Sequence, residues 1–176
     1  FHSILQKPNG KRLEVMQKIA ENIDKIIVMT NVGVEILRNE YNLKTEIKVV
    51  PHGIPSVEYE KQENTKKQLG YHGKIILSSF GMINSGKGYE YVIEALPEVV
   101  KHYPKLIYLI VGATHPIVRR SDGEKYRNFL QQKVKELGLT EHVKFYNKYV
   151  TLNEIIQYLK ATDIYISSTL TPEQIT

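Results

Sequence analysis

Short apolar runs alternate with longer amphipathic segments along most of the chain. The runs are rich in β-branched and aromatic residues, which is typical of β-strands. Their apolar residues are continuous rather than alternating with polar ones, as expected for strands buried on both faces of a parallel sheet. The pattern predicts strands over residues 25–29, 47–50, 74–80, 105–111, 143–146 and 163–167.

Helical periodicity is found between these strands. In residues 92–103 the apolar side chains recur at the spacing of one helical face. That face consists of Val92, Ile93, Leu96, Val99 and Val100. The sequences "SDGE" (residues 121–124) and "TLNE" (residues 151–154) have the Ser/Thr-x-x-Glu pattern of a capping box, so each predicts the start of a helix. A short helix is also expected around residues 65–69.

The order of these elements indicates the fold class. From residue 74 onward strands and helices alternate, which predicts an α/β fold with a doubly wound, open parallel sheet of the Rossmann-like type. Ligands of such sheets bind beyond the carboxyl ends of the strands. In the last predicted strand we expect Ile164 and Ile166 in the core, with Tyr165 facing a helix or the surface.

A change in composition divides the chain. Residues 51–73 combine prolines and glycines with a dense run of charge, which indicates a crossover. The segment before it supplies only two strands, too few for an independent α/β domain. We therefore expect an incomplete first domain (residues 1–52), an interdomain crossover (residues 53–73) and a ligand-binding domain that is incomplete at its C-terminus (residues 74–176).

The composition limits the kinds of site and ligand that are expected for this chain. The fractions of hydrophobic (41%) and charged (24%) residues are those of ordinary globular proteins. There is no cysteine, which excludes disulfides and thiolate metal sites. The net charge of +5 suits phosphorylated ligands or an anionic lipid surface. Basic and acidic residues are interspersed, however, so a nucleic-acid partner is not expected.

The loop after the third predicted strand has the features of a phosphate site. Gly81, Gly86 and Gly88 allow the backbone to approach a ligand closely, and Lys87 lies at the start of a helix, where anions are attracted. The spacing is that of a P-loop, but Gly88 replaces the Ser or Thr that would bind Mg²⁺, and the next strand ends in Gly112 rather than in an acidic residue. The loop is therefore not that of an ATPase. The alternative is a simple turn in which Lys87 is solvated.

Four features, in order along nearly the whole chain, resemble the retaining GT-B glycosyltransferases of the "group 1" family (family 4). "FG…KGYEYVIEALPEV" followed by "LIYLIVGATHP" is similar to the family's donor-binding domain, and "VVPHGIP" to its interdomain crossover. "VKFYNKYVTLNEIIQYLKATDIYISST" is similar to the stretch that carries the base-binding loop.

This resemblance implies transfer of a sugar from a nucleotide diphosphate-sugar to an acceptor hydroxyl, with retention and without a metal. Lys87 and helix N–H groups would stabilise the leaving diphosphate in the metal's place. The alternatives are an epimerase or phosphorylase on the same scaffold, or a non-catalytic nucleotide-binding α/β module.

The resemblance also implies donor-binding residues. Lys87 occupies the position of the family's diphosphate-binding lysine. Met82 replaces a second basic residue of the family, and Asn84 and Ser85 would make part of the missing contact. The other implied donor-binding positions are Gly81, Gly88, Gly112, His115 and Tyr146. Alternatively, His115 is a solvated or capping residue and Tyr146 a packing aromatic.

Two catalytic residues are implied near the chain ends. His2 matches the family's cleft histidine, although a residue so close to the chain start is often frayed. Glu173 matches the first of two glutamates separated by seven residues, and Gln174 takes that position under a shifted alignment. The second glutamate is not in this sequence. We therefore expect a fragment that lacks most of one domain and the last part of the other.

The implied partners follow from the same resemblance. The nucleotide sugar is a substrate, so no cofactor is expected. The acceptor would be a saccharide or a lipid-linked molecule, and the full enzyme would associate peripherally with a membrane. The expected location is cytoplasmic, or at the inner face of the membrane.

We expect the 176-residue chain by itself to show no measurable transferase activity. The reason is that the cleft needs both domains to exclude water and to position the acceptor. The measurement is release of nucleoside diphosphate from a panel of nucleotide sugars. Turnover above an enzyme-free blank would contradict this expectation.

Overall fold

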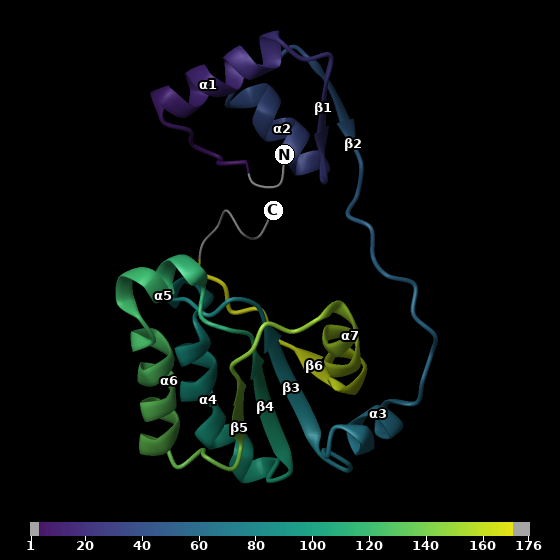
Figure 1. Ribbon diagram of the computed structural model, residues 1–176, viewed down its shortest axis with the longest axis vertical. Helices are drawn as coiled ribbons and strands as arrows, with labels where there is room; N and C mark the ends of the chain where they lie inside the picture. Colours follow the sequence, from purple (N-terminus) through teal and green to yellow (C-terminus); the bar gives the residue numbers. More distant parts are fainter. Residues whose placement is uncertain (1–3, 171–176) are drawn as a thin grey trace. The chain divides into compact units, whose positions relative to one another are not determined.

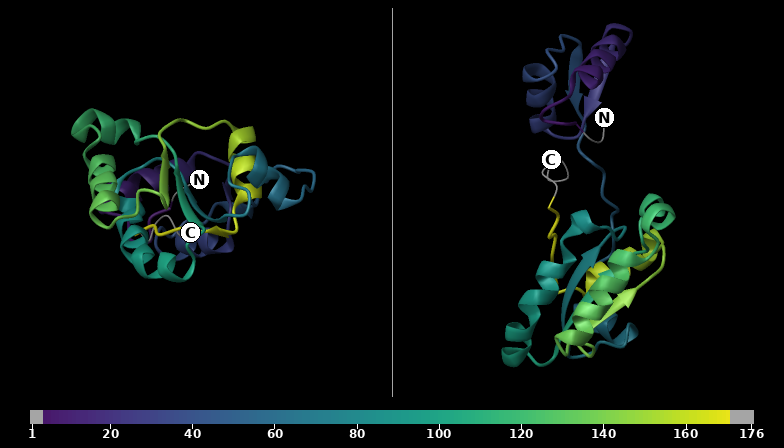
Figure 2. Two further views of the ribbon diagram at one scale, coloured as in Figure 1. Left: turned by 90° about the horizontal axis from the view of Figure 1, so that it is seen from below. Right: turned by 90° about the vertical axis from the view of Figure 1, so that its left-hand side faces the viewer.

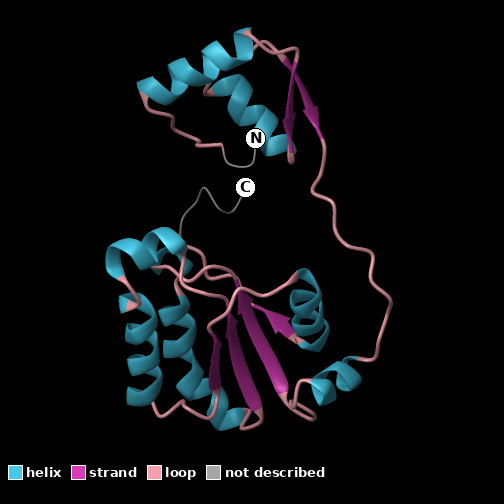
Figure 3. Ribbon diagram, viewed as in Figure 1, coloured by secondary structure: helices cyan, strands magenta, loops and turns pink. Residues whose placement is uncertain are grey.

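The computed structural model describes residues 4–170, which form two compact units. Within that range the first unit comprises residues 4–57 and the second comprises residues 58–170. Each unit combines parallel strands with helices (Figures 1 and 3). None of the helices within residues 4–170 has both the length and the apolar character needed to span a bilayer.

The first unit has two parallel strands and two helices. β1 (Lys25–Val28) pairs with β2 (Glu46–Val49), as predicted for this part of the chain. The helices are α1 (Gly10–Glu21) and α2 (Asn31–Asn39). Their N-caps are Asn9 and Thr30, whose side chains each accept a hydrogen bond from a first-turn N–H group.

Burial in the first unit differs from the prediction. Ile26 and Val28 are buried, whereas Lys25 and Ile27 are exposed. The expectation of strands buried on both faces is therefore wrong for β1. The physical reason is that the unit's core packs against one face only. That core consists of Ile4, Ala20, Ile26, Val28, Ile36, Leu37, Tyr41 and Leu43.

The second unit contains a four-stranded sheet in the order β5-β4-β3-β6, and every pairing is parallel. This confirms the predicted open parallel sheet of the α/β class. The strands are β3 (Ile75–Phe80), β4 (Leu106–Val111), β5 (Val143–Tyr146) and β6 (Ile164–Tyr165).

Helices cover both faces of this sheet. α4 and α6 lie on one side, and α3 and α7 lie together on the other (Figures 1 and 2). The helices are α3 (Gln62–Gln68), α4 (Tyr89–His102), α5 (Pro116–Asp122), α6 (Lys125–Glu136) and α7 (Leu152–Ala161). A single 3₁₀ turn, η1 (Ser85–Lys87), connects β3 to α4.

The central strand β4 shows why its sequence is continuously apolar. All six of its residues are buried. Leu106, Tyr108 and Ile110 belong to the core cluster under α4 and α6, whereas Ile107, Leu109 and Val111 belong to the cluster under α7. Alternate side chains of one strand therefore contribute to two cores, which is why both sets are predominantly apolar.

One predicted capping box is confirmed and the other is wrong. At the start of α7 the Thr151 hydroxyl accepts from the Glu154 N–H (3.3 Å), and the Glu154 carboxylate accepts from the Thr151 N–H (2.8 Å). Ser121 instead lies inside α5, where its hydroxyl donates to the Ile117 carbonyl (3.3 Å). The box cannot form because α5 already extends through Ser121 and ends just before Gly123.

The prediction for the last strand is also wrong in part. The exposed fraction of Ile164 is 55%, so it is not a core residue. Among the described residues only β3 pairs with β6, which makes β6 an edge strand. Tyr165 is exposed and stacks on Phe80 with ring centroids 5.9 Å apart, while Ile166 is partly buried against the core, as expected.

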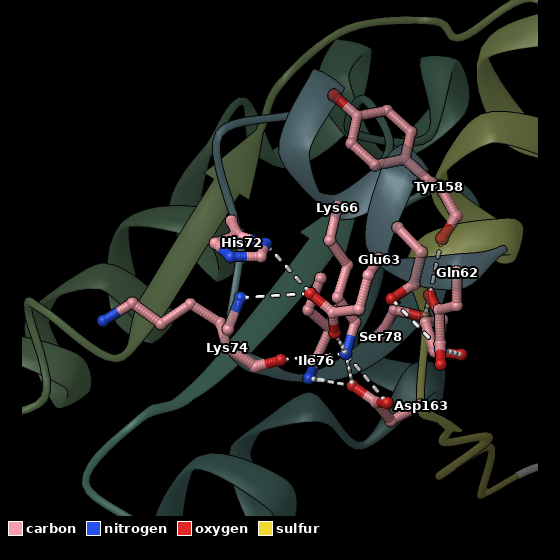
Figure 4. A network of polar contacts seen from close by, with 12 residues as sticks. Gln62, Glu63, Lys66, His72, Lys74, Ile76, Ser78, Tyr158 and Asp163 are labelled. Carbon is pink, nitrogen blue, oxygen red and sulfur yellow. Dashed lines mark hydrogen bonds and ion pairs between the residues drawn. The ribbon is translucent and has the colours of Figure 1, made fainter.

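A network of polar contacts fixes α3 to the sheet (Figure 4). The Lys66 ammonium is buried and lies 2.8 Å from an Asp163 carboxylate oxygen. It also donates to the Lys74 carbonyl (2.9 Å) and pairs with Glu63 (3.3 Å). The Asp163 carboxylate accepts from the Ile76 N–H (2.7 Å), so one carboxylate joins α3, β3 and the start of β6.

Replacing Asp163 tests this network. Asp163→Ala should lower the free energy of unfolding by about 1–3 kcal/mol, because the buried Lys66 ammonium and the Ile76 N–H each lose a partner. Glu141→Ala is a matched control, since the Glu141 side chain is 88% exposed, and it should cost about 0.5 kcal/mol or less. Urea unfolding followed by circular dichroism measures both. Equal losses would contradict the assigned role.

Candidate functional site

Two adjoining cavities open at the carboxyl ends of β3, β4 and β5. The smaller, of about 250 Å³, is mostly apolar and extends from Phe80 and Gly81 to Val150 and Ile155. The larger, of about 680 Å³, extends toward α5. They share the lining residues Met82, Ala113, Lys148 and Tyr149, and we call the two together the cleft. The cleft lies where ligands bind in open α/β sheets.

Two predicted glycines meet at the floor of the cleft. The Gly81 N–H donates to the Val111 carbonyl (3.1 Å), and the Gly112 N–H donates to the Tyr146 carbonyl (3.0 Å). Gly112 has φ 152°, and a Cβ atom there would lie 2.0 Å from the Gly81 carbonyl oxygen. No larger residue fits at Gly112 without displacing the end of β3, so the flat floor depends on this glycine.

The 3₁₀ turn η1 (Ser85–Lys87), which we call the Lys87 turn, lies beside this floor. Asn84 shapes the turn, because its side-chain oxygen accepts from the Gly86 N–H (2.9 Å) and its amide donates to the Met82 carbonyl (3.1 Å). A Cβ atom on Gly81 would lie 3.8 Å from the Lys87 ammonium, so the Lys87 side chain extends back over the glycine. The structure thus brings Gly81, Asn84 and Lys87 together, as the sequence predicts. Ser85 is the first residue of η1.

A buried arginine supports the floor from beneath. The Arg127 guanidinium donates to the Gly112 carbonyl (2.9 Å) and to the Glu124 carboxylate (3.2 Å). Burial lowers the pKa of Arg127. A hydrogen bond from Thr114, and secondarily the charge of Arg127, hold the pKa of Glu124 below its usual value. Glu124 is therefore an ionised counter-ion at neutral pH, and the pair stabilises the Gly112 backbone.

Sequence reasoning did not identify Arg127, although a signal was present. Arg127, Leu130 and Val134 have the i, i+3, i+7 spacing of one helical face, and all three are buried. An arginine on an otherwise apolar face indicates a buried polar partner. The partner could not be named from sequence, because it is a backbone carbonyl at the end of a different element.

Cationic side chains line the wider part of the cleft. They are Arg119, Arg120 and Lys148. Within residues 4–170 no Asp or Glu lines either cavity. Lys148 also pairs with Glu154, and that hydrogen bond, followed by one from the Thr151 backbone, lowers the pKa of Glu154 to about 2. A cleft lined by positive charge favours an anionic ligand.

Two other predicted residues have local structural contacts. The His115 ring nitrogen Nδ1 accepts from the Ile117 N–H (3.2 Å), so His115 caps α5. The Tyr146 hydroxyl hydrogen-bonds to the Tyr71 hydroxyl (2.6 Å), and its ring packs against Tyr158 with centroids 5.2 Å apart. Of the predicted donor-binding residues, only Gly81 and Gly112 line the cleft. Those that do not are Asn84, Ser85, Lys87, Gly88, His115 and Tyr146, although the Tyr146 carbonyl supports Gly112.

Three predicted residues are not placed. His2, Glu173 and Gln174 lie outside the described residues. In the part of the chain that the structure describes, no group of three or more His, Asp or Glu side chains could hold a metal ion.

Sequence comparison identifies related proteins. The sequence model of the family "Glycosyl transferases group 1" matches residues 60–174. Among curated proteins, the chain is similar to an alpha-monoglucosyldiacylglycerol synthase of Streptococcus pneumoniae strain R6. The two are 29% identical over 161 residues, which cover 87% of this chain and 34% of the relative. The chain therefore spans about a third of that protein's length.

Structural comparison shows the fold. The Anabaena protein HepE, crystallised with UDP, superposes with a TM-score of 0.76 at 21% identity, over 98% of this chain and 46% of HepE. Sucrose-phosphate synthase of Thermosynechococcus elongatus superposes with a TM-score of 0.72 at 22% identity, over 94% of this chain and 40% of the synthase. The chain thus has the Rossmann-like architecture of GT-B glycosyltransferases and spans less than half of either structure.

The close approach at the cleft floor can be tested by mutation. Gly112→Ala should lower the free energy of unfolding by about 3 kcal/mol or more, because backbone strain adds to displacement of the Gly81 carbonyl. Gly138→Ala is the matched control: Gly138 also has a positive φ (68°), but a Cβ atom there meets nothing within 4 Å. It should cost about 1–2 kcal/mol. Urea titrations that give equal losses would contradict the steric argument.

Proposed function

This chain belongs to the group 1 glycosyl transferases, and from that premise we propose that it contributes the donor site of an enzyme that transfers a sugar from a nucleotide diphosphate-sugar to an acceptor hydroxyl. The observation that carries the proposal is the position of Lys87. Its ammonium extends over Gly81, beside the Gly81–Gly112 floor and at the entrance to α4. A diphosphate bound there would meet a cation, a helix N-terminus and an exposed backbone.

The chemistry of the donor explains why these groups matter. When the bond between the sugar's anomeric carbon and the diphosphate oxygen breaks, negative charge builds up on the departing diphosphate. Lys87 and the first N–H groups of α4 would be in place before that charge develops, so they would stabilise the transition state without reorganisation. We propose that this replaces the divalent metal used by other transferases, that no cofactor takes part, and that the anomeric configuration is retained.

The cleft next to the Lys87 turn suits the nucleoside. Phe80, Val111, Val150 and Ile155 supply an apolar lining next to the diphosphate end. Arg119 and Arg120 line the larger cavity and Lys148 lines both cavities, and these cations would balance the negative charge of the ligand. HepE was crystallised with UDP and with UDP-glucose, which supports a uridine diphosphate-sugar as the first donor to test.

The acceptor is proposed on family grounds. The S. pneumoniae relative is named as a synthase of alpha-monoglucosyldiacylglycerol, which supports a lipid acceptor, with a saccharide as the other candidate. A lipid acceptor would place the full enzyme at a membrane surface, in keeping with the chain's net charge of +5. We propose the cytoplasm, or the inner face of the membrane, as its location.

Lys87→Ala should weaken UDP binding about ten- to a hundredfold, as expected for loss of a charge-assisted contact worth about 1.5–3 kcal/mol. Binding should be unchanged by EDTA and should weaken with added salt, because the attraction is electrostatic. Calorimetry on the 176-residue chain with UDP, GDP and ATP measures each effect. Lys135→Ala, an exposed lysine in the last turn of α6, is the matched control and should bind as the wild type does.

Two results would contradict the proposed function. The first is a strict requirement for Mg²⁺ together with a preference for ATP, which indicates a P-loop enzyme. The second is unchanged UDP affinity in a Lys87→Ala protein that circular dichroism shows to be folded.

A further inference from the structure

The segment that follows β6 lies against the Lys87 turn. We call residues Ser168–Leu170 the strap. The Ser168 hydroxyl donates to the Lys87 carbonyl (2.7 Å), and the Leu170 N–H donates to the Gly86 carbonyl (2.9 Å). Both acceptors are backbone atoms of η1, so the strap holds the turn itself and leaves the Lys87 side chain directed toward Gly81.

Gly88 allows the strap and the Lys87 turn to approach each other closely. It has φ 62°, and a Cβ atom there would lie 2.5 Å from the Ser168 carbonyl oxygen and 3.1 Å from the Leu170 side chain. Only glycine combines that conformation with that clearance. The strap and the turn are therefore packed backbone to backbone along Gly86, Lys87 and Gly88.

The strap is itself anchored to the sheet. The Ile166 N–H donates to the Ser78 carbonyl (2.8 Å), and the Ser79 hydroxyl donates to the Ile166 carbonyl (2.7 Å). Ser79 is buried and also hydrogen-bonds to the Tyr108 hydroxyl (2.8 Å). Three residues before Ile166, Asp163 forms an ion pair with Lys66 and accepts a hydrogen bond from the Ile76 N–H (Figure 4). The strap is thus a fixed support for the turn.

The turn needs such a support. It is a single 3₁₀ turn, whose hydrogen bonds have poorer geometry than those of an α-helix. Gly86 lies within it and Gly88 ends it, and glycine loses more conformational freedom on ordering than any other residue. Asn84 closes the turn from its N-terminal side. Its C-terminal side is held by Ser168 and Leu170.

We propose that Ser168 is a positioning residue for diphosphate binding: its hydroxyl holds the Lys87 backbone so that the ammonium is already over the Gly81–Gly112 floor before the ligand arrives. This inference rests on the proposed function of Lys87 as the diphosphate contact. Loss of the Ser168 hydroxyl would release the turn, and binding would then have to order it again. Ser168 acts through Lys87 and does not itself touch the donor.

The chain offers a matched control for this residue. Ser167 is adjacent and exposed, and within residues 4–170 its side chain makes no hydrogen bond. Ser167→Ala therefore removes an equivalent hydroxyl group from the residue next to the strap and leaves the contacts with the turn intact. Ser168→Thr keeps the donor and should restore binding, whereas Ser168→Cys fills a similar volume with a weaker donor.

The test is a double-mutant cycle with UDP and uridine as probes, measured by NMR titration of the 176-residue chain. Ser168→Ala should weaken UDP binding about three- to tenfold, the effect of one hydrogen bond, and should leave uridine binding unchanged. In a Lys87→Ala background, Ser168→Ala should change UDP affinity by less than about twofold, because the two residues act as one unit. Ser167→Ala and Ser168→Thr should bind UDP as the wild type does.

Several outcomes would overturn the inference. They are wild-type UDP affinity in Ser168→Ala, an equal loss for uridine, or additive effects in the double mutant. If Ser168→Ala does not fold, Ser168→Cys carries the same cycle. If Lys87→Ala has no effect on UDP binding, the proposed function fails and this inference with it. If Lys87→Ala weakens binding and Ser168→Ala does not, only the positioning role is wrong.

Discussion

The second unit depends on an ion pair between a buried lysine and an aspartate far away in the chain. A lysine removed from water needs a counter-ion, and Lys66 finds it in Asp163, 97 residues further on. The same carboxylate accepts the Ile76 N–H, so it aligns the start of β6 with β3. Since β6 contributes only two residues to the sheet, its alignment relies on side-chain contacts of this kind. The strap that reaches the Lys87 turn begins three residues after β6, so the geometry of the proposed diphosphate site follows from this pair.

Backbone atoms form the floor of the cleft, and charged side chains lie around it. Gly81 and Gly112 form a floor without side chains, in which the Gly81 carbonyl packs directly against Gly112. Arg127 holds the Gly112 carbonyl from the buried side, with Glu124 as its counter-ion. Lys87 then adds one directed cation, and Arg119, Arg120 and Lys148 add a wider positive field. In this arrangement a rigid scaffold presents the charged groups, and rigidity is what makes them effective toward a developing negative charge.

This construction fits the chemistry of the family to which the chain belongs. The chain matches the family over residues 60–174, and fold alone does not determine the donor or the acceptor. The physical task in the proposed reaction is stabilisation of a departing diphosphate, and a lysine at a helix N-terminus suits that task whichever sugar is transferred. Specificity would come from the cleft lining, to which α5 and the loop between β5 and α7 contribute side chains.

The sequence by itself determined the elements whose signals are local. Apolar runs predicted the six strands found within residues 4–170, although only β4 is buried at every residue. Thr151 to Glu154 predicted a helix start because a capping box lies within four residues. The glycine-rich loop with Lys87 predicted an anion site for the same local reason. Only the tertiary structure decided the rest: that Ser121 lies inside α5, that Ile164 is on an edge strand, that Arg127 supports Gly112, and that Ser168 holds the Lys87 turn. Ser121 lies inside α5 because that helix continues past it. The other three depend on how other elements lie around the residue, and that arrangement is set by the packing of the whole unit, which no local pattern encodes.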